Sequence, residues 1–167
     1  MTSTSTPFRD TIVGPRWLAI TGAATLVFLA VIIAVAAPAV VAEREHVGAW
    51  TVVVLLIGAV LVLGAGLLAL TRRIVLSVTS AHVDAWLSPF RVEHIPLADI
   101  ERIDLVDVTP SGAGGVGWRI LGTDRFLLWS AGPAVRLTLS QGSTRTLRSD
   151  RAVELRAAIR NAQTSPQ

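Results

Sequence analysis

Two long apolar runs without charge constrain this chain more than any other feature. Residues 17–42 (WLAITGAATLVFLAVIIAVAAPAVVA) and 50–71 (WTVVVLLIGAVLVLGAGLLALT) contain no Asp, Glu, Lys or Arg. Built as helices, they would be about 39 Å and about 33 Å long, more than the roughly 30 Å of a bilayer's hydrocarbon core. The polar link between them, which contains Glu43 to His46, is short enough to make the helices antiparallel neighbours. The sequence therefore predicts a transmembrane hairpin.

The placement of arginine predicts the orientation of this hairpin. Arg9 and Arg16 precede the first run, and Arg72 and Arg73 follow the second. The link between the runs holds only Arg44, beside two glutamates. Because basic residues favour the cytoplasmic side, we expect both termini in the cytoplasm.

Four residues are expected to anchor the hairpin at the two membrane–water interfaces. Trp17 and Trp50 open the runs, and tryptophan favours the headgroup level. Arg72 and Arg73 close the second run, where their long side chains can extend to the headgroups.

A cleaved signal peptide is the alternative interpretation of the first run. Residues 40–42 (VVA) resemble a cleavage site. The apolar region of a signal peptide is only about 7–15 residues long, shorter than this run. Even after cleavage, the second run would keep the C-terminal domain on the inner side.

Composition excludes several kinds of site. The chain has no cysteine, which excludes disulfides, thiolate metal sites and cysteine nucleophiles. Only 16% of its 167 residues are charged, against roughly a quarter in average domains, and the deficit lies before residue 72. The remainder suffices for one small domain.

After Arg73 the apolar pattern changes to a period of two, which is typical of strands. Residues 135–139 (VRLTL) show it best. The expected strands cover residues 74–79, 83–88, 91–95, 100–108, 117–121, 125–129, 134–140 and 143–148. Strands so short and so evenly spaced favour an antiparallel sandwich or barrel.

The last expected element is an amphipathic helix that Asp150 caps and that runs to Gln163. The sequence thus predicts an α+β membrane protein in four parts. These are a cytoplasmic tail (1–16), the hairpin (17–71), a β domain closed by the helix (72–163) and a second tail (164–167).

Residues 95–104 (IPLADIERID) resemble the signature of bacterial pleckstrin-homology-like domains. In that family a strand ends in Ile-Pro-Leu, and a short turn then delivers the Ile that starts the next strand. Two membrane helices often precede such a domain. The resemblance covers residues 72–163 and implies a PH-like fold on a bacterial plasma membrane. The glycine-rich segment before residue 117 and the strand after it depart from the family pattern, so the resemblance is to a divergent member.

No motif in the sequence indicates catalysis, a cofactor or a metal, and we expect a protein that is not an enzyme. Gly112, Gly114 and Gly117 spell G-x-G-x-x-G, but a strand-like run follows where a dinucleotide site needs a helix. His46, His82 and His94 show no metal-ligand spacing, so the latter two are expected to be ordinary strand or turn residues.

Charge divides the domain into two halves. Residues 74–116 hold two arginines and six acidic residues, whereas residues 117–160 hold eight arginines and three acidic residues. Such asymmetry can attract a protein partner or anionic lipid. The candidate basic surface consists of Arg119, Arg125, Arg136, Arg145 and Arg148.

Three functions follow from these expectations. The first is a PH-like binding or scaffold module that recruits another membrane or membrane-associated protein. The second is a sensor of anionic lipid, and the third is a subunit of a membrane enzyme or transporter complex. Nucleic acid is not an expected partner, because no stripe of basic and aromatic residues is present.

Overall fold

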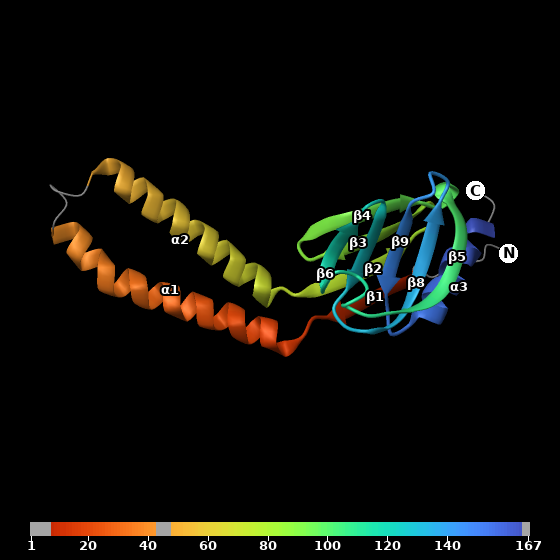
Figure 1. Cartoon of the computed structure of the whole chain (residues 1–167), viewed down its shortest axis with the longest axis horizontal. Helices are drawn as coiled ribbons and strands as arrows, with labels where there is room; N and C mark the ends of the chain where they lie inside the picture. The colour runs from red at the N-terminus through yellow and green to blue at the C-terminus, as the bar shows by residue number, and fades with distance from the viewer. Residues whose placement is uncertain (1–7, 43–47, 165–167) are drawn as a thin grey trace. The chain divides into compact units, whose positions relative to one another are not determined.

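The computed structural model describes residues 8–42 and 48–164, which form an α+β structure (Figure 1). The chain divides into two compact units. One unit is helical and consists of Pro15–Arg72, and the other joins Met1–Gly14 to Arg73–Gln167. The expected polar turn at Glu43 to His46 lies outside the described residues.

The helical unit is a pair of helices, α1 (Arg16–Ala42) and α2 (Ala49–Leu70). Both are long and apolar enough to cross a membrane, as the sequence predicts. The most apolar part of α1 is 0% buried and that of α2 is 6% buried. Both helices therefore expose almost all of their most apolar surface within the described residues.

The two helices pack closely together at small residues. A Cβ atom added to Gly22 would lie 2.8 Å from the Cβ of Ala69 and 2.9 Å from the carbonyl oxygen of Gly66. A Cβ added to Gly66 would lie 2.6 Å from a methyl carbon of Leu26. The missing side chains therefore allow the two backbones to pack together, a common device between apolar helices.

The first sheet has the strand order β1-β2-β3-β4, with antiparallel neighbours throughout. Its strands are β1 (Phe8–Val13), β2 (Arg73–Val78), β3 (His82–Leu87) and β4 (Phe90–Pro96).

Strand β1 corrects the expectation that residues 1–16 form a separate tail. It precedes α1 in the chain, yet it pairs along its whole length with β2, from Phe8 opposite Val78 to Val13 opposite Arg73. Ile12 is only 7% exposed and belongs to the core. The helical hairpin is thus inserted between two paired strands.

The second sheet has the order β5-β8-β9-β7-β6. Its strands are β5 (Ile100–Val108), β6 (Gly117–Leu121), β7 (Asp124–Leu128), β8 (Gly132–Leu139) and β9 (Thr144–Arg148). The expectation of a wholly antiparallel fold is wrong for one pair, because β7 and β9 run parallel. The chain reverses twice between them, once before and once after β8, so both strands point the same way.

Both sheets and the C-terminal helix α3 (Ala152–Thr164) bury side chains in one apolar core. Each of these three parts supplies fully buried residues, among them Leu76 and Val83, Leu127 and Leu137, and Leu155 and Ile159. The 3-10 turn η1 (Leu97–Asp99) joins the first sheet to the second. The side-chain nitrogen Nε2 of Gln163 donates hydrogen bonds to the backbone carbonyl oxygens of Leu97 (3.1 Å) and Ile100 (3.0 Å). These bonds fix the end of α3 to this turn.

Candidate functional site

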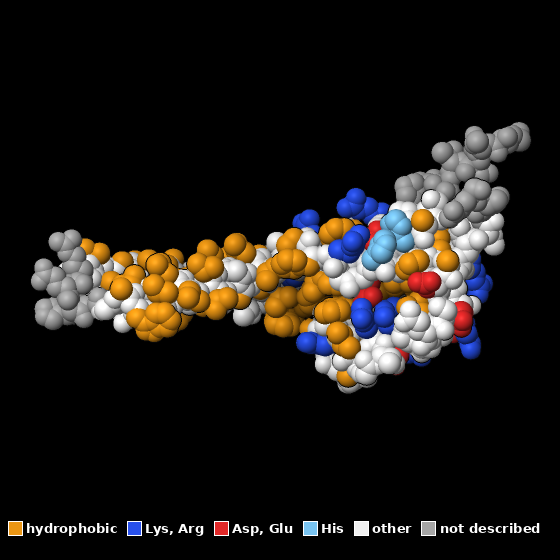
Figure 2. All heavy atoms as spheres, turned by 90° about the horizontal axis from the view of Figure 1, so that it is seen from above, with side chains coloured by type: hydrophobic (Ala, Val, Ile, Leu, Met, Phe, Trp, Pro, Cys, Tyr) orange, Lys and Arg blue, Asp and Glu red, His pale blue; other side chains and the backbone are white. Residues whose placement is uncertain are grey.

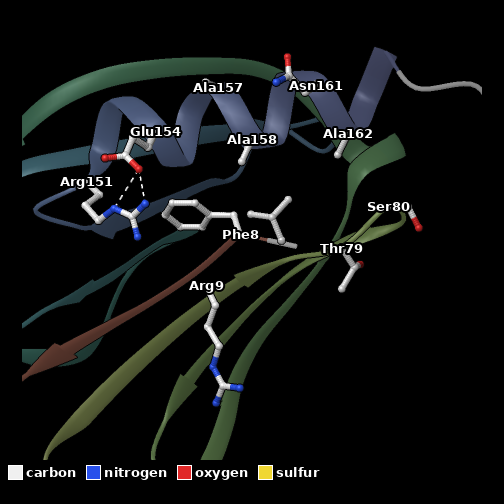
Figure 3. A pocket seen from close by; sticks show the side chains of 11 residues that line it. Phe8, Arg9, Thr79, Ser80, Arg151, Glu154, Ala157, Ala158, Asn161 and Ala162 are labelled. Atoms are coloured by element: carbon white, nitrogen blue, oxygen red, sulfur yellow. Dashed lines mark hydrogen bonds and ion pairs between the residues drawn. The ribbon is translucent and has the colours of Figure 1, made fainter. Parts of the chain in front are cut away.

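A groove of about 730 Å³ lies between α3 and the first sheet (Figure 3). Its apolar lining comes from Phe8, Val78 and three alanines of α3, so that no bulky side chain of the helix fills it. Its polar lining comes from Arg9 of β1, from the β2–β3 turn, from Arg151 just before α3 and from Glu154 and Asn161 of the helix. The residues that line the groove are Phe8, Arg9, Val78, Thr79, Ser80, Arg151, Glu154, Ala157, Ala158, Asn161 and Ala162.

An ion pair stands at one end of the groove. Arg151 donates hydrogen bonds to Glu154, one of them from Nε at 2.9 Å, and its guanidinium lies 5.1 Å from the centroid of the Phe8 ring. The hydrogen bond from Arg151 lowers the pKa of Glu154, and the bond to Glu154 raises the pKa of Arg151. Both groups are therefore charged at neutral pH, and this end of the groove offers a cation and an anion side by side.

The groove lies at one end of the β1–β2 ladder, and the chain leads to the helices from the other end. Phe8 and Val78 are paired at the groove, whereas Val13 and Arg73 are paired where the chain passes into α1 and out of α2. Five strand intervals of about 3.3 Å separate these two ends by about 17 Å. A ligand in the groove therefore occupies the end of the sheet that is remote from both helix connections.

A buried carboxylate connects the two sheets elsewhere in the domain. Glu93 of β4 is 5% exposed and points into the space between the sheets. It accepts hydrogen bonds from Trp118 Nε1 at 3.0 Å, from Arg125 at 3.3 Å and from Arg145 Nε at 3.1 Å. These donors come from β6, β7 and β9, so a single acidic side chain holds three strands of the second sheet against the first.

This network uses two of the five arginines of the expected basic surface. Arg125 and Arg145 are paired across β7 and β9 and both bind Glu93. Arg145 is largely buried, with 12% of its side chain exposed. Sequence reasoning missed Glu93 as their partner, because 32 and 52 residues separate it from them.

The other three arginines of that surface lie on the opposite face of the second sheet. Strand register places Arg119 beside Phe126, Arg136 beside Thr146 and Arg148 beside Ala134. Arg148 is largely buried and forms an ion pair with Asp150 at 2.6 Å. The five side chains are thus divided between two faces.

The expected anchor residues lie at the ends of the two helices. Trp17 and Trp50 stand in the first turns of α1 and α2 and are 56% and 76% exposed. Arg73 begins β2, directly after Arg72.

The glycine-rich segment leads into a strand, as the sequence predicts. Gly112 and Gly114 belong to the turn between β5 and β6, and Gly117 starts β6. Ala113 in this turn is 1% exposed and packs with Val108, Leu128 and Ala134. The turn therefore covers the outer face of the second sheet, which gives these glycines a structural role.

The structure brings His82 and His94 together with Asp84, a cluster that the sequence analysis did not predict. His82 and His94 lie on neighbouring strands, and both contact Asp84. His46 lies outside the described residues. The sequence does hold a signal for this cluster. His82 and Asp84 form the pattern His-x-Asp on one strand, and the following hairpin places His94 opposite Asp84.

Comparisons with protein-family models, with curated proteins and with solved structures found no match to this chain.

Proposed function

We propose that this protein is a membrane-anchored, non-enzymatic binding module that holds a partner protein at the inner face of a bacterial plasma membrane. The observation that carries the proposal is the groove beside α3, because it joins an apolar floor to a charged end and lies away from the helix connections. We further propose that the β domain is a divergent PH-like sandwich, closed at one end by α3.

Two features support the PH-like assignment. The residues that resemble the family signature form the corner between the sheets, with Leu97 and Ile100 6% and 5% exposed. The C-terminal helix packs into the common core and is hydrogen-bonded to this corner.

The position of β1 supports a hairpin that stays attached to the domain. Because β1 pairs with β2, the start of α1 and the end of α2 must lie on the same side of any bilayer that the helices cross. Cleavage after Ala42 would also remove β1 from the sheet and take Ile12 out of the core. Both arguments favour two membrane crossings over a cleaved signal peptide.

Cysteine labelling tests this sidedness directly, because the natural chain has no cysteine. We expect a membrane-impermeant maleimide to label Glu45→Cys on intact cells, since residue 45 belongs to the link that the proposed orientation puts outside. Ser165→Cys should react only after the membrane is permeabilised. Labelling of Ser165→Cys on intact cells would reverse the proposed orientation.

The occupant proposed for the groove is an extended segment of a protein partner. β1 is the terminal strand of its sheet, and a terminal strand can accept a further strand through its backbone. The small side chains of Ala157 and Ala158 beside it leave room for the side chains of such a segment. Attachment to the membrane would raise the effective concentration of a membrane-bound partner.

Photo-crosslinking in cells tests this proposal. A photoreactive amino acid at Ser80, which lines the groove, should give a specific crosslinked protein. The same amino acid at Val153, which is 62% exposed on α3 and outside the groove, should not. Ala158→Phe should fill the groove and abolish the Ser80 product while the chain remains folded. Equal products from Ser80 and Val153 would contradict a site in the groove.

Anionic lipid is the less favoured ligand. Arg125, Arg145 and Arg148 already form ion pairs within the domain. If lipid were the ligand, binding of the purified chain to acidic vesicles would fall steeply with salt.

A further inference from the structure

Two histidines and one aspartate meet on the outer face of the first sheet. His82 and Asp84 are two residues apart on β3, so their side chains point to the same face. His94 on β4 is the direct cross-strand partner of Asp84 and shares that face. The intervening residue Val83 points to the opposite face and is fully buried in the core.

The three polar groups are close together. His94 Nδ1 lies 2.7 Å from Asp84 Oδ1, and His82 Nε2 lies 3.1 Å from Asp84 Oδ2. The ligating atoms of all three residues lie within 4.8 Å of one another, and the two ring centroids are 4.5 Å apart. The pale blue patch in Figure 2 is this histidine pair, seen on an open surface of the domain.

We infer that His82, Asp84 and His94 form a site for a divalent transition-metal ion of the zinc type. Two imidazole nitrogens and one carboxylate oxygen are a common ligand set for such ions, with water in the remaining position. Around zinc, ligands at about 2.0–2.1 Å lie about 3.3 Å apart, so the trio needs only small side-chain rotations to close on the ion.

The sheet gives this site a rigid base. Both strands are held in the β3–β4 ladder, so the backbone fixes the three Cβ positions. The Asp84 side chain is only 12% exposed, whereas those of His82 and His94 are 32% and 45% exposed. The carboxylate is thus set at the bottom of the site, and the open side faces water from which an ion can enter.

Metal binding would replace the contacts that now join the three side chains. His94 Nδ1 is hydrogen-bonded to Asp84 Oδ1, and His82 Nε2 lies 3.1 Å from Asp84 Oδ2. To coordinate the ion, each of these two nitrogens must present its lone pair, so each imidazole would carry its proton on the other ring nitrogen.

Arg91 provides a signed test of the site. Its guanidinium lies 3.8 Å from Asp84 Oδ1, and its side chain is 50% exposed. The positive charge opposes a cation at the trio. Arg91→Gln should therefore tighten metal binding. If Arg91 and Asp84 form only a structural ion pair, the substitution would lower stability and leave zinc affinity unchanged.

The experiment is calorimetric titration of the full, tag-free chain in detergent micelles with Zn(II). We expect one ion per chain. His94→Gln and His82→Asn should each weaken zinc binding by more than about 100-fold. Loss of a residue that only hydrogen-bonds to a metal ligand costs about 10–100-fold, and a ligand itself should cost more. Both histidines are partly exposed, so these variants are expected to keep the fold, as their thermal unfolding would show.

His46→Gln is the matched control, because it removes the only other histidine of the sequence. Its zinc affinity should equal that of the natural chain. In the Co(II)-loaded chain, visible absorption should report nitrogen ligands and disappear in His94→Gln. Absence of saturable zinc binding to the folded chain, binding that survives both histidine substitutions, or loss confined to His46→Gln would each overturn the inference.

Discussion

Glu93→Gln is expected to destabilise the β domain by about 3–5 kcal/mol, the cost of breaking a buried ion pair by removal of one partner. The substitution preserves the size of the side chain but removes the charge that faces Arg125 and Arg145. Arg145 is the more affected of the two, since only 12% of its side chain is exposed and it cannot regain full hydration. The measurement is denaturant unfolding of the full chain in detergent, followed by tryptophan fluorescence.

Asp104→Asn is the control for this prediction. It removes the charge from an ion pair with Arg102, whose side chain is 74% exposed, at a distance of 2.9 Å. Exposed pairs contribute about 0–1 kcal/mol, so the control should unfold almost like the natural chain. Similar small losses for both variants would show that Glu93 does not hold the sheets together.

Ile12→Ala is expected to destabilise the same domain by about 2–5 kcal/mol, as truncation of a buried isoleucine does. Ile12 is 7% exposed and packs in the core beside its cross-strand partner Ile74. The same unfolding measurement applies. The result would show that a residue before the first helix is part of a domain that otherwise begins after the second.

Its neighbour supplies the control. Val13 follows Ile12 on the same strand but points to the other face and is 59% exposed. Val13→Ala should change the free energy of unfolding by no more than about 0.5 kcal/mol. Equal effects at the two positions would contradict the register of β1 in the sheet.

Most of the secondary structure could be predicted from local pattern. The expected strands 100–108 and 117–121 agree with β5 and β6 at both ends, and the expected helix from Asp150 to Gln163 agrees with α3 within two residues. These segments were predicted correctly because the signals for them, the spacing of apolar residues and the flanking turn residues, lie close together in the sequence.

What could not be predicted depends on contacts between distant residues. β1 turns Phe8, Asp10 and Ile12 inward, but its partner strand begins only after both long helices. The parallel pairing of β7 with β9 has no local signature either.

The candidate sites were missed for the same reason. The groove joins Phe8 to α3, and Glu93 meets arginines from the other sheet. The basic surface was expected from charge counted along the sequence, which does not tell on which face of a sheet an arginine lies.

The insertion of two long helices between β1 and β2 also fixes the order in which this protein can be completed during synthesis. β1 is made first, yet its hydrogen-bonding partner leaves the ribosome only after both apolar helices have been made. Until then the segment that carries Ile12 has no sheet to join. A chain in which only one helix had been threaded through a bilayer would leave the two strands on opposite sides, and the first sheet would lack its outermost strand. If the two helices cross a bilayer as proposed, insertion of both is a precondition for a finished core, and a wrongly threaded chain would leave β2 as the terminal strand of the first sheet.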